Sequence, residues 1–251
     1  MDTFLEIALL IGVGFVAGII NTLAGGGSLL TLPVLIFLGL PPQIANGTNR
    51  IVILVQSLSG TFGFRSKGVK TAPFDWYLGF TATLGALVGA QIALEIEGAL
   101  FNKILALIML GVGLLILFQK QRNLPDKLPK LTGFNRYVSM LLFFFVGIYG
   151  GFINAGIGFV ILLILTQLND LSLVKANAVK VTVVTIYTVV ALFFFSTHSA
   201  VAWEPGLWMA SGSGLSAWLS SRWSVNRGDR FIRIFLFVMV VLLALKLWVD
   251  Q

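Results

Sequence analysis

Long apolar runs separated by short polar segments cover the whole 251-residue chain. A helix needs about 20 residues to cross about 30 Å of hydrocarbon, and most of these runs are long enough to do so. The apolar runs lie at approximately 4–24, 26–39, 44–63, 76–94, 99–118, 137–155, 157–168, 176–197, 206–221 and 231–249. We therefore predict an all-α integral membrane protein.

Two of the runs, 26–39 and 157–168, are short for a membrane span, and each follows a glycine-rich break. The first break contains Gly25, Gly26 and Gly27. Lipid cannot satisfy the N–H and C=O groups of irregular backbone, which a membrane tolerates only inside protein or beside a cavity. We predict that each short run is the second arm of a helical hairpin, either re-entrant or only just spanning.

The charge of the loops predicts an orientation. Lys and Arg concentrate in three loops, at 64–75, 119–136 and 222–233. Cytoplasmic loops of membrane proteins carry such an excess, so we place all three in the cytoplasm. Every single-helix crossing then alternates correctly only if residues 4–39 begin and end outside and residues 137–170 begin and end inside. Both segments must therefore turn back, and both chain termini are expected outside.

The chain also contains an internal repeat. Four residues recur 133 positions later, with Gly14, Gly18, Asn21 and Gly25 matched by Gly147, Gly151, Asn154 and Gly158. A second match, 131 positions apart, pairs Asn46 with Asn177. We predict two inverted repeats, 1–118 and 137–251, joined by a cytoplasmic linker at 119–136, each a glycine-broken helical hairpin followed by three transmembrane helices. Many secondary transporters share this architecture, with repeats related by a pseudo-two-fold axis in the membrane plane.

Each hairpin tip is a candidate anion site. The start of the second arm has unpaired N–H groups, which together with the helix dipole attract negative charge. Glycines at the first tip allow a ligand to approach the backbone, and Ser28 is a good N-cap whose hydroxyl can also donate. The amides of Asn21 and Asn154 can brace the turn or bind the ligand. Close helix packing is the alternative role for glycine, and we favour it for Gly14, Gly18, Gly147 and Gly151.

A polar face runs along the helix that follows the first hairpin. Asn46, Asn49 and Arg50 lie at i, i+3 and i+4 and share one side of that helix. Asn177 and Lys180 repeat the spacing. A charge inside a spanning helix costs about 2.5–3.5 kcal/mol on insertion scales, which makes it a candidate for function. Snorkelling to the interface is the alternative, and it explains Lys180 on the cytoplasmic side better than Arg50 on the outer side.

These patterns give one set of predicted site residues. The substrate-binding candidates are Asn21, Gly25, Gly26, Gly27, Ser28, Asn46, Asn49, Arg50, Asn154, Gly158, Asn177 and Lys180. The candidates to line a path are Gln56, Ser57, Tyr187 and Thr188, with polar contacts between helices as an equal alternative. We predict no carboxylate near the middle of the membrane. Buried cations and amides without buried acids favour a negatively charged substrate.

Composition excludes several other classes of function. The chain is 57% apolar and 11% charged with a formal net charge of +7, and because its cations sit in short loops we do not expect nucleic-acid binding. It has no cysteine and one histidine, His198, which excludes thiolate sites and a histidine metal cluster. Without a nucleotide-binding loop or a nucleophile–base pair, neither an enzyme nor a cofactor is expected. The expected partners are a small anion and the lipid bilayer, with a homodimer left open.

At these residues the chain resembles the TauE/SafE sulfite exporter family of membrane permeases. The resemblance covers nearly the whole chain and rests on Gly14 to Gly18, Asn21, Gly25 to Ser28, Pro33 and Ala45 to Arg50, and on the degenerate second copy Gly147 to Gly158 and Ala176 to Lys180. It implies transport of small sulfur-containing anions or organosulfonates, such as sulfite, thiosulfate or sulfoacetate, across the cell membrane, here a bacterial inner membrane. The second copy lacks the triple glycine, which implies an asymmetric site.

Together these observations favour a secondary transporter of small sulfur-containing anions that works by alternating access. Two alternatives use the same scaffold, namely an anion-selective channel and a transporter of another small organic anion. A membrane scaffold that transports nothing is a third. If Arg50 and Lys180 bind substrate, replacing either with alanine is expected to weaken binding and leave folding intact.

Overall fold

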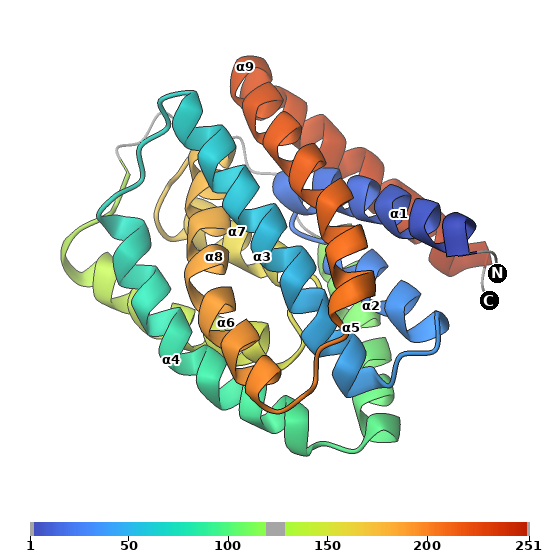
Figure 1. Cartoon of the computed structure of the whole chain (residues 1–251). Coiled ribbons are helices and arrows are strands. Elements are labelled where there is room, and N and C mark those ends of the chain that lie inside the picture. Colours follow the sequence, from blue (N-terminus) through green and yellow to red (C-terminus); the bar gives the residue numbers. More distant parts are fainter. Residues whose placement is uncertain (1–2, 119–128, 250–251) are drawn as a thin grey trace.

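The computed structural model describes residues 3–118 and 129–249 of the chain, with side chains over 4–108, at 111 and over 129–227. Regular structure in these ranges is helical (Figure 1). The helices are α1 (Thr3–Leu23), α2 (Ser28–Phe37), α3 (Pro42–Ser66), α4 (Phe74–Glu95), α5 (Gly98–Phe118), α6 (Gly133–Phe152), α7 (Ile157–Gln167), α8 (Leu173–Thr197) and α9 (Trp203–Val249). The prediction of an all-α protein is confirmed for these ranges.

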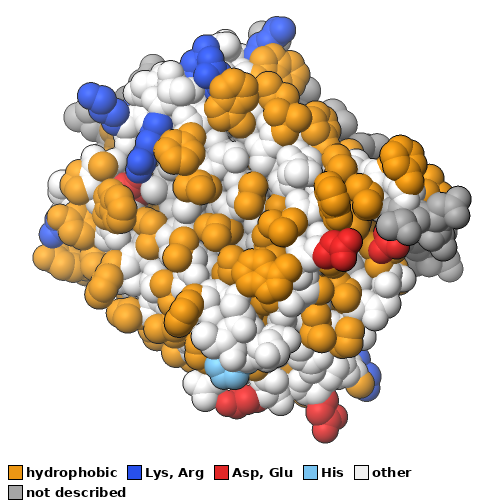
Figure 2. Space-filling model, viewed as in Figure 1, with side chains coloured by type: hydrophobic (Ala, Val, Ile, Leu, Met, Phe, Trp, Pro, Cys, Tyr) orange, Lys and Arg blue, Asp and Glu red, His pale blue; other side chains and the backbone are white. Residues whose placement is uncertain are grey.

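Among the described helices, three are long and apolar enough to span a membrane, namely α1 from Phe4, α4 and α8. The α3 helix equals α8 in length, at 25 residues, but its polar face makes it less apolar. Apolar side chains spread over the middle of the face in Figure 2, and Lys and Arg gather mostly toward its upper end. Phe80 and Phe193 are 64% and 70% exposed. Large apolar side chains exposed in this number mark a surface that faces lipid.

Both predicted hairpins are present. The chain reverses between α1 and α2 and again between α6 and α7, where Gly25 (φ 94°) and Gly156 (φ 71°) supply left-handed backbone. The second arms have 10 and 11 residues. At 1.5 Å per residue these helices are about 15–17 Å long, about half of the hydrocarbon thickness. The prediction of two short second arms is confirmed.

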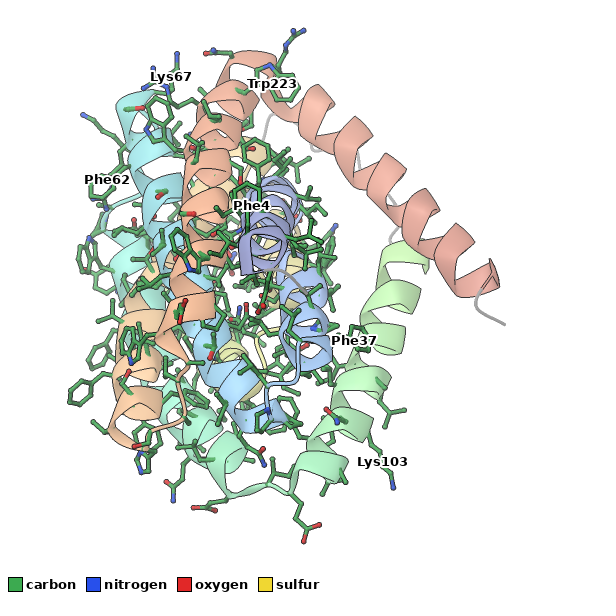
Figure 3. All side chains as sticks on the ribbon, turned by 45° about the vertical axis from the view of Figure 1, so that its right-hand side comes forward. Phe4, Phe37, Phe62, Lys67, Lys103 and Trp223 are labelled. Carbon is green, nitrogen blue, oxygen red and sulfur yellow. The ribbon has the colours of Figure 1, made fainter. Side chains whose placement is uncertain are left out.

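The end of the chain differs from the prediction. In place of two helices separated by a loop at 222–233, the backbone forms one helix of 47 residues, α9. Figure 3 shows that α9 bends near Trp223 rather than unwinding. The charged residues here do not end the helix because Pro205 is the last proline of the chain and Gly228 is the only glycine between 222 and 233. At a membrane edge, charged side chains can face water while the backbone keeps its helical hydrogen bonds.

The predicted linker at 119–136 lies partly outside the described residues, and its last residues, from Gly133 onward, belong to α6. Just before α6, the N–H of Lys130 donates to the Asn169 carbonyl oxygen at 3.0 Å. The Asn169 side chain returns a hydrogen bond to the Lys130 carbonyl oxygen at 3.0 Å, and Lys130 forms an ion pair with Asp170 at 3.1 Å. These contacts tie the end of the linker to the turn that follows α7.

The helices pack in a reciprocal pattern. The α4 helix packs on α6 and α8, α9 packs on α1 and α3, and α3 and α8 pack on each other. Glycines allow the closest approaches. A Cβ at Gly14 would lie 2.0 Å from a carbonyl oxygen of α9, and one at Gly147 would lie 2.0 Å from a carbonyl oxygen of α4. Gly18 and Gly151, one turn further along, meet the same neighbouring helices, so the packing role predicted for these four glycines is confirmed.

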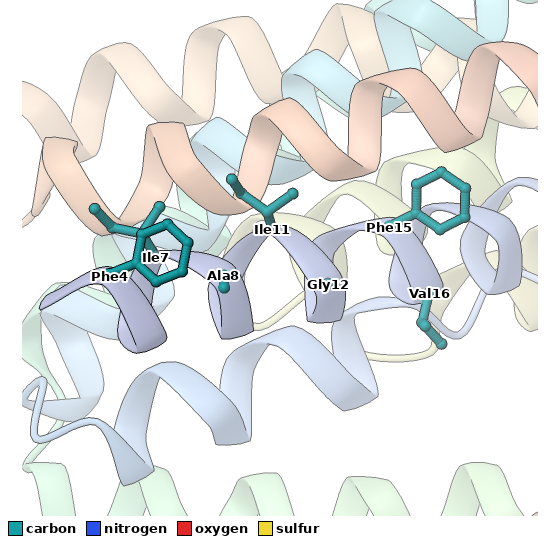
Figure 4. Close-up of a pocket in the computed structure, with 7 residues that line it drawn as sticks. All are labelled: Phe4, Ile7, Ala8, Ile11, Gly12, Phe15 and Val16. Carbon is teal, nitrogen blue, oxygen red and sulfur yellow. The ribbon is translucent and has the colours of Figure 1, made fainter. Parts of the chain in front are cut away.

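Two apolar hollows open on the outside of the bundle. The first, of about 670 Å³, lies along α1 and is lined by Phe4, Ile7, Ala8, Ile11, Gly12, Phe15 and Val16 (Figure 4). The second, of about 410 Å³, lies between α5, α6 and α7. Neither hollow is lined by Arg50 or Lys180. Apolar walls of this kind match lipid chains rather than an anion.

Candidate functional site

The two hairpin tips touch each other through glycine. The N–H of Gly158, at the start of α7, donates to the carbonyl oxygen of Gly25 at 3.2 Å. A Cβ at Gly25 would lie 2.4 Å from the Cα of Gly158, and a Cβ at Gly158 would lie 2.3 Å from the Cα of Gly25. Any side chain at either position would force the backbones apart. These two predicted site residues therefore let one hairpin approach the other.

Arg50, on α3, contacts the end of α6, which is the first arm of the second hairpin. Its side chain is fully buried, and its guanidinium donates to the carbonyl oxygens of Gly150, Gly151 (2.8 Å) and Phe152 (3.2 Å). It also donates to Asn46 Oδ1 at 3.1 Å, while Asn46 Nδ2 donates to the Phe152 carbonyl oxygen at 2.7 Å. The last carbonyls of a helix have no partner within it and carry the negative end of its dipole. Arg50 and Asn46 therefore cap the C-terminus of α6.

Lys180 does the same for the first hairpin. Its ammonium donates to the carbonyl oxygens of Asn21 (2.7 Å) and Thr22 (3.1 Å) and to Asn177 Oδ1 (2.5 Å). Asn177 Nδ2 donates to the Leu23 carbonyl oxygen at 3.2 Å. Lys180 and Asn177 therefore cap the C-terminus of α1. Each cation belongs to the half of the chain opposite to the helix that it caps.

The two cations and their neighbouring asparagines thus form two hydrogen-bonded clusters, one at the end of each first arm. Arg50 and Asn46 contact the second hairpin, and Lys180 and Asn177 contact the first. The sequence suggested that the cations would face an anion at the N-termini of the second arms. A broken helix, however, leaves carbonyls unpaired at the end of its first arm as well as N–H groups at the start of its second. Arg50 and Lys180 donate their hydrogen bonds to the carbonyls at the ends of the first arms.

Hydroxyls and amides lie where the second arms begin. Tyr187 donates to Asn154 Oδ1 at 2.5 Å, and Asn154 Nδ2 lies 3.4 Å from Ser28 Oγ. Thr31 Oγ1 donates to Asn49 Oδ1 at 2.7 Å. Ser28, Asn49 and Asn154 therefore all take part in hydrogen bonds at the first turn of α2. Thr31 was not predicted, although its position three residues after Ser28 places both hydroxyls on one face of α2.

The matched asparagines have different roles. Asn21 lies inside α1, and its Oδ1 accepts from the Gly27 N–H at 3.4 Å, so it braces the turn. Asn154 lies beyond the end of α6 in left-handed backbone, with φ 62°. Its hydrogen bond with Ser28 joins the two hairpins, and its hydrogen bond with Tyr187 joins the second tip to α8.

Three of the predicted path-lining residues make hydrogen bonds in the interior. Gln56 Nε2 donates to carbonyl oxygens of α1, at 3.2 Å for Ala17. Ser57 Oγ donates within its own helix, to the Leu54 carbonyl oxygen at 3.2 Å. Gln56 and Tyr187 thus join neighbouring helices, which was the alternative role. Thr188 is fully buried and its hydroxyl has no hydrogen-bond partner.

Thr188 is one of several such groups. Within the described side chains, the buried atoms without a hydrogen-bond partner are Thr22 Oγ1, Asn49 Nδ2, Arg50 Nε, Thr188 Oγ1 and Asp170 Oδ2, of which the last lies in an ion pair. Most buried polar groups in proteins are paired, so each exception needs an explanation. The other four can all donate a hydrogen bond. Asn49 Nδ2 and Arg50 Nε can only donate, whereas the two threonine hydroxyls can also accept.

The buried charge is positive. Arg50 is 0% exposed and Lys180 is 2% exposed, and the ring of Phe195 lies 5.2 Å from Arg50 Cζ. Among the described side chains, Asp75 is the fully buried carboxylate. It lies in the first turn of α4 and accepts a hydrogen bond from the Thr71 hydroxyl at 2.5 Å. It therefore does not neutralise either cation by direct contact.

Comparison with known proteins identifies the family. The family model described as sulfite exporter TauE/SafE matches residues 10–247. The chain belongs to the TauE/SafE family. A curated relative from Haemophilus influenzae, named a probable membrane transporter protein, is 30% identical over 100% of this chain and 98% of its own length. The probable membrane transporter protein YfcA of Escherichia coli strain K12 is 28% identical over 99% of this chain and 93% of its own.

No solved structure matches the chain. The resemblance to the TauE/SafE family seen in the sequence is confirmed, and the apolar helices agree with a membrane protein of that family. The relatives are named as transporters rather than enzymes. The match spans both hairpins and both caps, so the geometry described here belongs to the part of the chain that the TauE/SafE family shares.

Proposed function

We propose that the protein is a secondary transporter of small sulfur-containing anions, such as sulfite, thiosulfate or an organosulfonate, across the cell membrane. The observation that carries this proposal is the pair of half-membrane helices whose N-termini begin where the hairpin tips touch, with a buried cation beside each hairpin. Helix N-termini and cations both favour negative charge. The family name supplies the sulfur chemistry.

The proposed architecture is a pair of inverted repeats. Exchanging the two halves of the chain turns the packing of α1 on α9 into that of α6 on α4, and the packing of α3 on α9 into that of α8 on α4. The α3 and α8 helices begin 131 residues apart and end 131 residues apart. Both end in the same turn, in which Val69 N–H reaches the Phe64 carbonyl oxygen (3.2 Å) and Ala200 N–H reaches the Phe195 carbonyl oxygen (3.1 Å). These correspondences support two copies of one unit, and the loop charges support their opposite orientations.

The proposed mechanism is alternating access controlled by the two caps. An anion bound at the hairpin tips attracts the nearby cations Arg50 and Lys180 and so weakens their hydrogen bonds to the helix carbonyls, because a charged acceptor interacts more strongly with a cation than a neutral carbonyl does. Each cap joins one half of the chain to a hairpin of the other half. Releasing one cap therefore frees one hairpin while the other stays held, and the halves rock about the contact between Gly25 and Gly158. Both chain termini are expected outside the cell in this scheme.

Transport into liposomes tests the proposal. Purified protein is reconstituted, and uptake of radiolabelled thiosulfate and sulfite is measured with unlabelled sulfite, thiosulfate, sulfoacetate or taurine either added outside or loaded inside, and with acetate as a control. We expect uptake above that of empty liposomes, inhibited by the sulfur oxyanions and accelerated by the same anions on the opposite side. Trans-stimulation is the behaviour of a carrier. Uptake without it would indicate a channel, and absence of uptake for every sulfur anion would refute the proposed substrate class.

A further inference from the structure

The two hairpins differ in the first turn of the second arm. In α2 this turn carries Ser28 and Thr31, which are 3% and 2% exposed and lie on one face of the helix. In α7 the corresponding turn runs from Ile157 to Val160 and contains no side chain that can donate a hydrogen bond. The Gly158 N–H in this turn is already used by the Gly25 carbonyl oxygen. Only the first hairpin therefore offers side-chain donors at a helix N-terminus.

An unpaired amide lies beside that turn. The Asn49 side chain is 0% exposed, and its Oδ1 accepts the hydrogen bond of Thr31 Oγ1 at 2.7 Å. This contact holds the amide against α2, while Asn49 Nδ2 has no hydrogen-bond partner. The amino group of an amide has two hydrogens and can only donate. A buried donor of this kind requires an acceptor that is absent from the protein around it, and an anion oxygen is such an acceptor.

The second hairpin has no counterpart of this donor. The residue 131 positions after Asn49 is Lys180, whose ammonium is taken by Asn177 and by the carbonyls of α1. The amide of Asn154, at the second tip, is used at both ends, by Tyr187 at Oδ1 and by Ser28 at Nδ2. The place that would mirror the first site is therefore filled by the protein.

We propose that the anion binds to one hairpin only, at the first turn of α2. In this site Asn49 Nδ2 and the Ser28 hydroxyl donate to oxygens of an oxyanion, and the N-terminal dipole of α2 adds to the attraction. Thr31 is a positioning residue, because it holds the amide through Oδ1 so that Nδ2 faces the ligand. The second hairpin supplies the contact against which the first one closes. This inference rests on the proposed function and assigns its anion to named atoms.

Binding of sulfite to the purified full-length chain in detergent tests the inference. Dissociation constants are measured by calorimetry for the wild type, Asn49→Ala, Asn49→Asp and Thr31→Val, with Thr166→Val as the control. Thr166 lies on α7, is 7% exposed and donates to its own helix at Leu162, so it matches Thr31 in burial and shape but not in position. We expect Asn49→Ala to raise the dissociation constant about tenfold or more. Thr31→Val should raise it less, and Thr166→Val should leave it unchanged.

The aspartate variant separates binding from folding. Asn49→Asp keeps an oxygen for Thr31 and replaces the donor with a group that repels anions, so we expect no measurable binding together with a thermal unfolding midpoint that stays close to that of Asn49→Ala. Wild-type affinity in both Asn49 variants would overturn the inference and leave the proposed function standing. Binding of nitrate, phosphate or acetate that depends on Asn49, without binding of any sulfur anion, would uphold the site and refute the proposed substrate. If the wild-type chain binds neither sulfite nor nitrate, phosphate or acetate, both the inferred site and the proposed function are overturned.

Discussion

Removing the Arg50 side chain is the sharpest test of the caps. Arg50→Ala removes the hydrogen bonds to three carbonyls of α6 and to Asn46 Oδ1. Asn46 Nδ2 still serves Phe152, so the carbonyls of Gly150 and Gly151 are left without this partner in a buried place. An unsatisfied buried group costs about 1–3 kcal/mol. Removing the guanidinium also removes the cost of its own desolvation, which offsets part of this loss.

We therefore expect Arg50→Ala to lower the free energy of unfolding by about 1–3 kcal/mol. This replaces the expectation from the sequence that folding would stay intact. The measurement is a thermal and denaturant unfolding series of the purified protein in one detergent, with Arg50→Lys and Arg65→Ala alongside. Arg50→Lys keeps the charge but loses the planar fork, so its loss should be intermediate. Arg65 is exposed near the end of the same helix, and its replacement should change stability by less than about 0.5 kcal/mol. If Arg50→Ala unfolds together with Arg65→Ala, the cap does not stabilise the fold.

Two further predictions concern the tips and the orientation. Gly158→Ala places a Cβ 2.3 Å from the Cα of Gly25, so we expect the free energy of unfolding to fall by about 1–3 kcal/mol, or the protein to fail to accumulate in the membrane. A Cβ at Gly12 would have nothing within 4 Å, so Gly12→Ala should be neutral or slightly stabilising in the same unfolding assay. Because the chain has no cysteine, single introduced cysteines report sidedness directly. An impermeant thiol reagent should label Glu97→Cys in intact cells and Lys70→Cys only after permeabilisation, and the reverse result would invert the orientation.

Much of the fold could be predicted from the sequence because it is encoded locally. A triple glycine followed by a short apolar run predicts a hairpin, and glycines four residues apart predict close helix packing. The continuity of α9 through Trp223 differs from the prediction because a cluster of charges predicts a loop only where helix-breaking residues accompany it, and these are scarce there.

The caps could not be predicted because their partners are distant in sequence. Arg50 meets Gly150 and Lys180 meets Thr22, at separations of 100 and 158 residues. The sequence identified both cations as too costly to be incidental in a membrane, but not the carbonyls that they satisfy. Asn49 was identified by its spacing from Asn46 and Arg50, whereas its unpaired amino group depends on Thr31, which only the packing of α2 on α3 reveals.

The crossed caps also constrain how the protein is made. Membrane insertion proceeds from the N-terminus as the chain leaves the ribosome. The carbonyls at the end of α1 must wait until Lys180 has been synthesised, because the ammonium that satisfies them lies 158 residues after Thr22. The first hairpin therefore enters the bilayer with these carbonyls uncapped by Lys180. Folding of the first half is therefore complete only after the second half has been synthesised.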